Sequence, residues 1–161
     1  MSFTEGSYEK ALIALFENLG YQHQYGPNIE RDYYVPFYEE QLIESLTTIN
    51  YGKPRPAIDE AISKLKDIEI GSLPQRNELF MDYLQHGIEV SFFDGKEQCN
   101  DIIYLIDYND KNIKRNDFKV INQWTFVENS EKRADIILFV NGLPLVVIEL
   151  KSPSREETNV S

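Results

Sequence analysis

The stretch that decides the fold is RADIILFVNGLPLVVIELKSP, residues 133–153, near the end of a chain of 161 residues. Its Asn141-Gly142 dipeptide is the strongest short-range signal for a β-hairpin, and apolar runs flank it on both sides. Residues 134–140 and 143–151 are therefore predicted to form two paired strands. Both runs are apolar at successive positions, which is typical of strands covered on both faces.

Three charged side chains interrupt these apolar strands. Asp135 stands in the first strand, and Glu149 and Lys151 stand two residues apart in the second. Because strand side chains alternate between faces, a regular two-residue loop would place Asp135 and Glu149 on opposite faces. A loop with an odd number of residues, or one β-bulge, would bring all three charges to one face. Since Pro144 cannot donate to a regular ladder, we predict the odd or bulged form.

Two carboxylates that converge in this way repel each other unless a cation lies between them. Mg²⁺ prefers carboxylate and water oxygens, and a nearby lysine would stabilise a developing phosphate charge. The alternative is a local ion pair at a strand end with Asp135 solvated, because structural ion pairs also group carboxylates with lysines. Residue types alone favour this ion pair, and the apolar strands around the three charges strengthen the case for the metal site.

The rest of the chain predicts an α/β protein. Apolar spacing indicates a first helix over 7–19, with Ser7 as its N-cap, Gly20 just beyond its end and Glu9 in its first turn. A short strand is expected at 21–25, three amphipathic helices between about 36 and 86, and further strands at 88–93, 101–108 and 118–127.

Composition limits the class of protein. Cys99 is the one cysteine, which excludes an internal disulfide and fits the cytoplasm. His23 and His86 have no cysteine at zinc-site spacing, and no stretch has the length of a membrane span. The net charge of −11 gives no long-range attraction for nucleic acid. A small basic patch, Lys111, Lys114, Arg115 and Lys119, is interpreted as a solvated loop rather than a contact to a DNA backbone.

Asp135 followed by Glu149-Leu150-Lys151 on adjacent strands has the form of the PD-(D/E)xK nuclease motif. The whole segment 133–153 resembles the N-terminal nuclease domain of the R (restriction and translocation) subunit of type I restriction-modification enzymes, although Ala134 stands where that family often has proline. The stretches YEKALIALFENLGYQ, RNELFMDYLQHGIEV and IDYNDKNIKRNDFKVINQWTF also resemble that family, whereas residues 27–70 resemble it less.

The resemblance implies a restriction-endonuclease-like core, with a mixed central sheet flanked by helices and a helical insertion at about 36–86. It implies four catalytic residues, which are Asp135, Glu149, Lys151 and Glu9. Asp135, Glu149 and Glu9 would hold Mg²⁺, and Lys151 would orient or help deprotonate the attacking water. Glu5 is a nearby competitor for the role of Glu9.

The resemblance also implies a nuclease domain at 1–151 that is incomplete on its C-terminal side, followed by a polar tail at 152–161. The chain has no G-x-x-x-x-G-K-[ST] loop and lacks the family's Gln-x-x-x-Tyr motif, so we expect a fragment of a larger polypeptide whose other domains use ATP. Expected partners are double-stranded DNA and the methyltransferase and specificity subunits, in the cytoplasm. Two alternatives are a nuclease-fold docking or regulatory module that does not cleave, and a stand-alone nuclease of the same superfamily.

Overall fold

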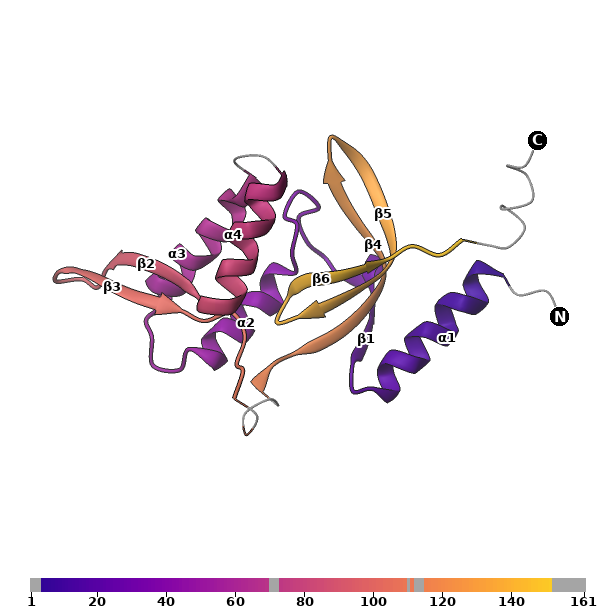
Figure 1. Cartoon of the computed structure of the whole chain (residues 1–161), viewed down its shortest axis with the longest axis horizontal. Helices are drawn as coiled ribbons and strands as arrows, with labels where there is room; N and C mark the ends of the chain where they lie inside the picture. Colours follow the sequence, from indigo (N-terminus) through magenta and orange to yellow (C-terminus); the bar gives the residue numbers. More distant parts are fainter. Residues whose placement is uncertain (1–3, 70–72, 110, 112–114, 152–161) are drawn as a thin grey trace. The chain divides into compact units, whose positions relative to one another are not determined.

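The structure is a computed structural model that describes residues 4–69, 73–109, 111 and 115–151. The chain divides into two compact units, whose elements are labelled in Figure 1. The sheet unit contains the residues up to Pro36, residues 118–140 and the residues from Pro144 onward. The insertion unit contains residues 37–117 together with Asn141–Leu143.

The sheet unit is built on one four-stranded mixed sheet. Its elements are α1 (Glu5–Asn18), β1 (Gln22–Tyr25), the 3-10 turn η1 (Gly26–Asn28), β4 (Phe118–Glu128), β5 (Ser130–Val140) and β6 (Leu143–Ile148). The strand order is β1-β4-β5-β6, with β1 parallel to β4 and β4 antiparallel to β5. This arrangement confirms the predicted α/β class and is compatible with a restriction-endonuclease-like core.

Helix α1 begins earlier than the sequence predicts. The side-chain oxygen of Thr4 accepts a hydrogen bond from the backbone N–H of Ser7 at 3.2 Å, so Thr4 is the N-cap and the prediction of Ser7 is wrong. Both residues offer the same hydroxyl acceptor, and local sequence does not choose between them. Gly20 follows the C-cap with a φ of +103°, as predicted. Glu5 occupies the first turn, and Glu9 lies in the second.

The core of the sheet unit covers both faces of β5. On one face, Ile13 of α1 packs with Val120, Ile136 and Leu138, and Leu12 and Phe16 lie against this cluster. On the other face, the rings of Trp124 and Phe139 lie 4.7 Å apart between centroids. This confirms the prediction that β5 is apolar on both faces because both are buried.

Strand β6 differs from that prediction. Leu145, Val146 and Val147 are exposed, so the expectation that both final strands are covered is wrong for β6. The reason is its position, because β6 is an edge strand among the described strands of the sheet. It also ends at Ile148, three residues before the predicted end at Lys151.

The insertion unit contains the three predicted helices and a separate hairpin. Its elements are α2 (Glu39–Ile49), α3 (Arg55–Lys66), the 3-10 turn η2 (Asp67–Glu69), α4 (Leu73–His86), β2 (Ile88–Phe93) and β3 (Gln98–Ile103), and β2 pairs antiparallel with β3. The strand predicted at 101–108 is therefore misplaced. Strand β3 ends at Ile103, before the predicted end, because the N–H of the next residue, Tyr104, donates to the side chain of Asn50 at 2.8 Å. The unit extends to Asp117, beyond the predicted boundary near residue 86.

The Asn141-Gly142 turn belongs to the core of the insertion unit. Asn141 is fully buried, and its amide donates to the carbonyl of Leu105 and to Asn116 Oδ1, each at 2.9 Å. The carbonyl of Gly142 accepts from the N–H of Tyr38 at 2.8 Å. Two residues separate β5 from β6 and both have positive φ, 55° and 83°, as a type I′ turn requires. The loop is therefore not odd, so that half of the prediction is wrong and the bulged form is left.

The remaining sequence expectations concern the surface. Lys119 is buried in β4, whereas Lys111 and Arg115 are exposed, so these residues do not share one exposed patch. Lys114 and the polar tail predicted for 152–161 lie outside the described residues. Among the described residues, no helix has both the length and the apolar character needed to cross a membrane.

Candidate active site

The side chains of Asp135 and Glu149 meet where the chain leaves β6. The Asp135 carboxylate is close enough to Glu149 to raise the pKa of the Glu149 side chain. The backbone N–H of Leu150 donates to Asp135 Oδ2 at 2.8 Å, which ties the Asp135 side chain to the segment that carries Glu149. The structure therefore brings together two of the residues that the sequence predicts for the site.

Packing of the neighbouring residues explains how the pair forms. Ile148 and Leu150 pack with Ile136 in the cluster on the α1 side of the sheet. By alternation, Asp135 and Glu149 project to the other side. A two-residue loop followed by regular pairing would have put Ile148 on the side of Asp135. The alternation has shifted by one residue before Ile148, as the bulged alternative of the sequence prediction requires.

Partial burial and the adjacent Asp135 carboxylate raise the pKa of Glu149 above its usual value of 4.5. Two carboxylates close together repel each other unless a cation lies between them. Their oxygens are the ligand type that Mg²⁺ prefers, and Mg²⁺ is commonly held by one or two carboxylates and several waters. The chemistry of the pair therefore fits a divalent cation.

The raised pKa leads to an expected pH dependence of stability in the absence of metal. A carboxyl group whose pKa is higher in the folded chain contributes stability that is complete below its ordinary, unfolded pKa and is lost as pH rises through the folded pKa. We expect Glu149→Gln to increase the free energy of unfolding at pH 7, by less than about 1 kcal/mol because the site is largely exposed. Urea titrations in EDTA at pH 4 and pH 7 measure this. A larger gain at pH 4 than at pH 7 would contradict the expectation.

Lys151 follows the pair along the chain and is exposed. It lies beyond the end of β6, so its direction is not set by strand pairing. Because its ammonium group is exposed, it can approach an anionic substrate without first leaving a buried position.

Glu9 makes its contacts with strand β4. It projects from α1 toward the sheet, where its Oε1 accepts from the Asn122 side chain at 2.5 Å and its Oε2 accepts from the Gln123 side chain at 2.9 Å. His23 Nε2 and Asn122 Oδ1 are 2.8 Å apart, so His23 of β1 also holds the Asn122 side chain in place. Within the described residues, Glu9 does not join Asp135 and Glu149 in a group of three ligand atoms within 4.8 Å.

Asn122 and Gln123 are site residues that sequence reasoning missed. Adjacent residues of a strand normally point to opposite faces, so a strand pattern gives no reason to place both on one carboxylate. The signal that could have been noticed is the pair of adjacent amides between the apolar residues of the strand FKVINQWTFV. Buried amides need partners, and this pattern therefore indicates a polar contact from another element.

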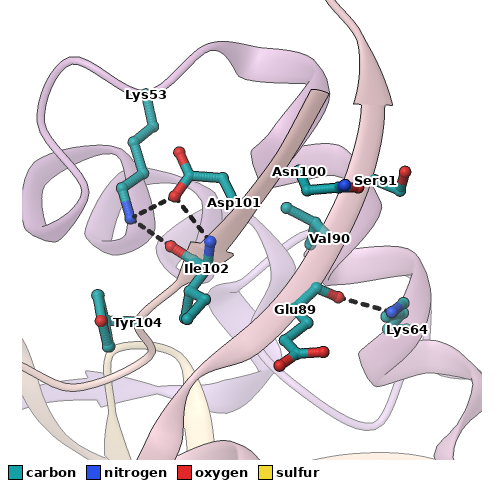
Figure 2. A pocket seen from close by; sticks show the side chains of 9 residues that line it. All are labelled: Lys53, Lys64, Glu89, Val90, Ser91, Asn100, Asp101, Ile102 and Tyr104. Carbon is teal, nitrogen blue, oxygen red and sulfur yellow. Dashed lines mark hydrogen bonds and ion pairs between the residues drawn. The ribbon is translucent and has the colours of Figure 1, made fainter. Parts of the chain in front are cut away.

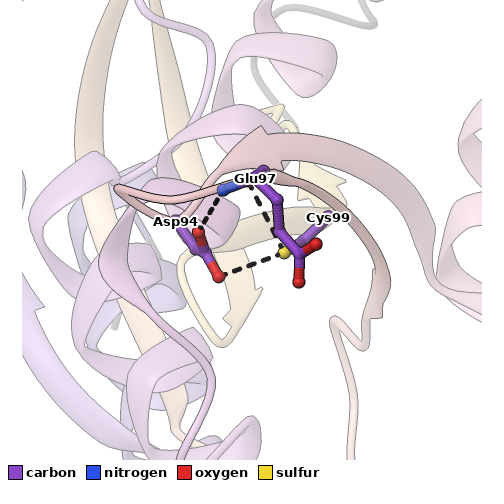
Figure 3. Close-up of side chains that lie close together, drawn as sticks. All are labelled: Asp94, Glu97 and Cys99. Carbon is purple, nitrogen blue, oxygen red and sulfur yellow. Dashed lines mark hydrogen bonds between the residues drawn. The ribbon is translucent and has the colours of Figure 1, made fainter.

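One cluster of metal-ligating side chains appears elsewhere in the described residues. Asp94, Glu97 and Cys99 lie together at the β2–β3 turn, with ligand atoms all within 4.8 Å (Figure 3). Asp94 Oδ1 accepts from the N–H groups of Lys96 and Glu97 at 2.8 and 2.9 Å. These are the contacts of an Asx turn that closes a hairpin, and they explain why the carboxylate lies there.

A groove of about 740 Å³ lies along the hairpin of the insertion unit (Figure 2). The ammonium group of Lys53 lies 3.4 Å from the carboxylate of Asp101 and also donates to the carbonyl of Ile102. Lys64 donates to the carbonyl of Glu89 at 2.6 Å. Both cations thus hold the hairpin to the neighbouring elements, and the groove has no carboxylate pair like that of Asp135 and Glu149.

Comparison with known proteins identifies the family. A family model described as "Type I restriction enzyme R protein N terminus" matches residues 2–160. The chain belongs to this family. This confirms the resemblance seen in the hairpin segment, and it means that the Asp135–Glu149 pair lies in the N-terminal part of an R protein.

Several relatives are similar over most of the chain. The HindI endonuclease subunit of Haemophilus influenzae is 30% identical over 166 residues, which cover 97% of this chain and 16% of that protein. The EcoprrI endonuclease subunit of Escherichia coli is 31% identical over 150 residues, covering 92% of this chain and 44% of that protein. A putative MjaIXP endonuclease subunit of Methanocaldococcus jannaschii is 28% identical over 160 residues. The chain thus spans less than half the length of these relatives.

Proposed function

We propose that this R protein N terminus is a nuclease that hydrolyses phosphodiester bonds of double-stranded DNA with Mg²⁺. The observation that carries the proposal is the hydrogen bond from the N–H of Leu150 to Asp135 Oδ2 at 2.8 Å, which places the Asp135 carboxylate beside the segment that carries Glu149. Such a pair has an unfavourable charge arrangement by itself, and a divalent cation removes the repulsion. Membership of a family whose relatives are named endonuclease subunits supports the same function.

The residues of the site would divide the chemistry among them. Asp135 and Glu149 would hold the cation through their carboxylate oxygens, and Lys151 would orient the attacking water or stabilise charge on the scissile phosphate. When bound, Mg²⁺ would lower the pKa of a coordinated water and neutralise phosphate charge. Glu9, predicted from the sequence as a third ligand, is hydrogen-bonded to two amides and is not included in this ligand set.

The chain would work within a longer R subunit. The relatives are much longer than the matched region, and their names assign the endonuclease function to a subunit of a type I restriction enzyme. We propose that the complete subunit couples cleavage to ATP-driven translocation and assembles with methyltransferase and specificity subunits. Those subunits would also supply most of the DNA contact, because this chain carries a net charge of −11.

The proposed function predicts that Lys151→Met separates metal binding from cleavage. We expect DNA cleavage by the complete R subunit in its assembled enzyme to fall by at least about 100-fold, the usual scale for loss of a positioned catalytic group. Calorimetric titration of Mn²⁺ into the chain should change little, because both carboxylates remain. Lys96→Met, an exposed lysine at the β2–β3 turn, is the control and should leave both measurements unchanged. Undiminished cleavage by Lys151→Met would refute the role of Lys151, and absence of cleavage by the unaltered enzyme would favour a non-cleaving module.

A further inference from the structure

Strand β4 has a backbone irregularity at Gln123, next to Asp135 of the neighbouring strand. The β4–β5 register pairs Asn122 with Ile136 and Trp124 with Ala134, and it skips the Gln123–Asp135 position between them. Gln123 has a φ of +54°, in the left-handed region that non-glycine residues rarely adopt. Such a conformation is strained and persists only where surrounding contacts impose it.

The irregularity reverses the faces of β4. Before it, Val120 packs in the cluster on the α1 side of the sheet. After it, the ring of Trp124 packs against Phe139, which alternation places on the other side. Regular alternation would have put Trp124 on the α1 side. The positive φ of Gln123 therefore turns the strand over at the position that faces Asp135.

The side chain of Gln123 takes part in this reversal. In a regular antiparallel ladder, Gln123 would lie directly across from Asp135 on the same face, with Cβ atoms about 4.5–5.5 Å apart. Its amide would then be a natural hydrogen-bond donor to the Asp135 carboxylate. Instead it is turned to the α1 side, where it donates to Glu9 Oε2 at 2.9 Å.

The packing of neighbouring residues accommodates the irregular backbone at Gln123. Gly26 lies against it so closely that an added Cβ would be 2.5 Å from the Gln123 carbonyl oxygen. Asn122 donates to the other oxygen of Glu9, so that one carboxylate receives both amides. The irregular conformation is thus supported from η1 and from α1 at the same time.

We propose that Glu9 is a positioning residue that acts through Gln123, and not a ligand of the metal. It captures the Gln123 amide on the α1 side and thereby keeps the open side of Asp135 free for a cation and a scissile phosphate. This inference rests on the proposed function, because it takes the Asp135–Glu149 pair as the metal site. It follows that cation binding and cleavage need the carboxylate of Glu9 only while residue 123 carries a side-chain amide.

The test is a rescue experiment with Mn²⁺ titrations of the chain and DNA cleavage by the complete R subunit. In Glu9→Ala, the freed Gln123 amide can return to Asp135, and we expect Mn²⁺ affinity and cleavage to fall by about 10–100-fold, as for other residues that orient a metal ligand. Adding Gln123→Gly removes the amide and tolerates the positive φ. The double variant Glu9→Ala/Gln123→Gly should regain Mn²⁺ affinity and cleavage to within about 3-fold of the unaltered protein, because no amide at position 123 is left to bind Asp135.

A matched control separates rescue from a general gain in stability. Asn129, at the β4–β5 turn, also has a positive φ, +61°, and lies outside the site. Glu9→Ala/Asn129→Gly should relieve comparable strain without restoring Mn²⁺ affinity. Glu9→Gln, which preserves helix packing and one acceptor oxygen, allows the same comparison should Glu9→Ala not fold.

Three results would have different meanings. Failure of Gln123→Gly to rescue either variant of Glu9 would overturn the inference and favour Glu9 as a direct ligand. Rescue by Asn129→Gly as well would also overturn it, because the loss would then reflect stability alone. Unchanged Mn²⁺ binding in Asp135→Asn would instead refute the metal site of the proposed function, whatever the Glu9 variants show.

Discussion

Asp135→Asn is expected to abolish DNA cleavage by the complete R subunit while leaving its fold intact. Asparagine has the shape of aspartate, and its side-chain oxygen can still accept the hydrogen bond from Leu150. It lacks the charge that would hold the cation beside Glu149. Because a bound metal supplies several kcal/mol of charge stabilisation in the transition state, cleavage should fall by at least about 1,000-fold.

Two further measurements make this result specific. ATP hydrolysis by the same assembled enzyme should persist, since the proposed motor lies outside this chain. Glu131→Gln removes an exposed carboxylate from the same strand, β5, and should leave cleavage unchanged. If the folded Asp135→Asn enzyme still cuts DNA at the normal rate, the pair is not the catalytic metal site.

Gly142→Ala is expected to cost about 2–5 kcal/mol of stability, which combines the strain of a left-handed alanine with overpacking. Gly142 has a φ of +83°, and an added Cβ would lie 2.6 Å from both the Tyr38 carbonyl oxygen and the Leu42 nitrogen. Both neighbours are backbone atoms of the α2 region, so they cannot move aside as a flexible side chain would. Urea denaturation of the chain measures the loss.

Gly52→Ala is the matched control for this prediction. Gly52 has nearly the same φ, +85°, but an added Cβ meets nothing within 4 Å. It should therefore show only the strain, about 1–2 kcal/mol. Equal losses in the two variants would show that the close approach of Gly142 to α2 does not contribute to stability.

The helices were predictable because helix signals are local. Apolar spacing over a few turns located α1 to α4, and only the ends moved, as when Thr4 rather than Ser7 capped α1. The turn between β5 and β6 was equally local. Its Asn-Gly sequence indicated a two-residue loop, and of the two predicted forms the odd loop is wrong, whereas the one-residue shift before Ile148 fits the bulged form.

The candidate site was predictable in part. The spacing of Asp135, Glu149 and Lys151 on adjacent strands was visible in the sequence, and the structure brings the two carboxyl groups together. The partners of Glu9 were not visible, because Asn122 and Gln123 are more than 100 positions away in the chain. Strand alternation would also place the adjacent side chains of Asn122 and Gln123 on opposite faces, and only the positive φ at Gln123 lets both bind Glu9.

By itself the sequence determined the element types, the hairpin and the residues able to form a carboxylate pair, since these depend on periodicity and on the chemistry of neighbours along the chain. The tertiary structure decided which strand lies at the sheet edge, that the Asn141-Gly142 turn is buried, and that β4 turns over beside Asp135. Those features depend on contacts between distant segments. Because protein interiors are closely packed, contacts between distant segments fix one backbone conformation, and a local sequence pattern does not show which one.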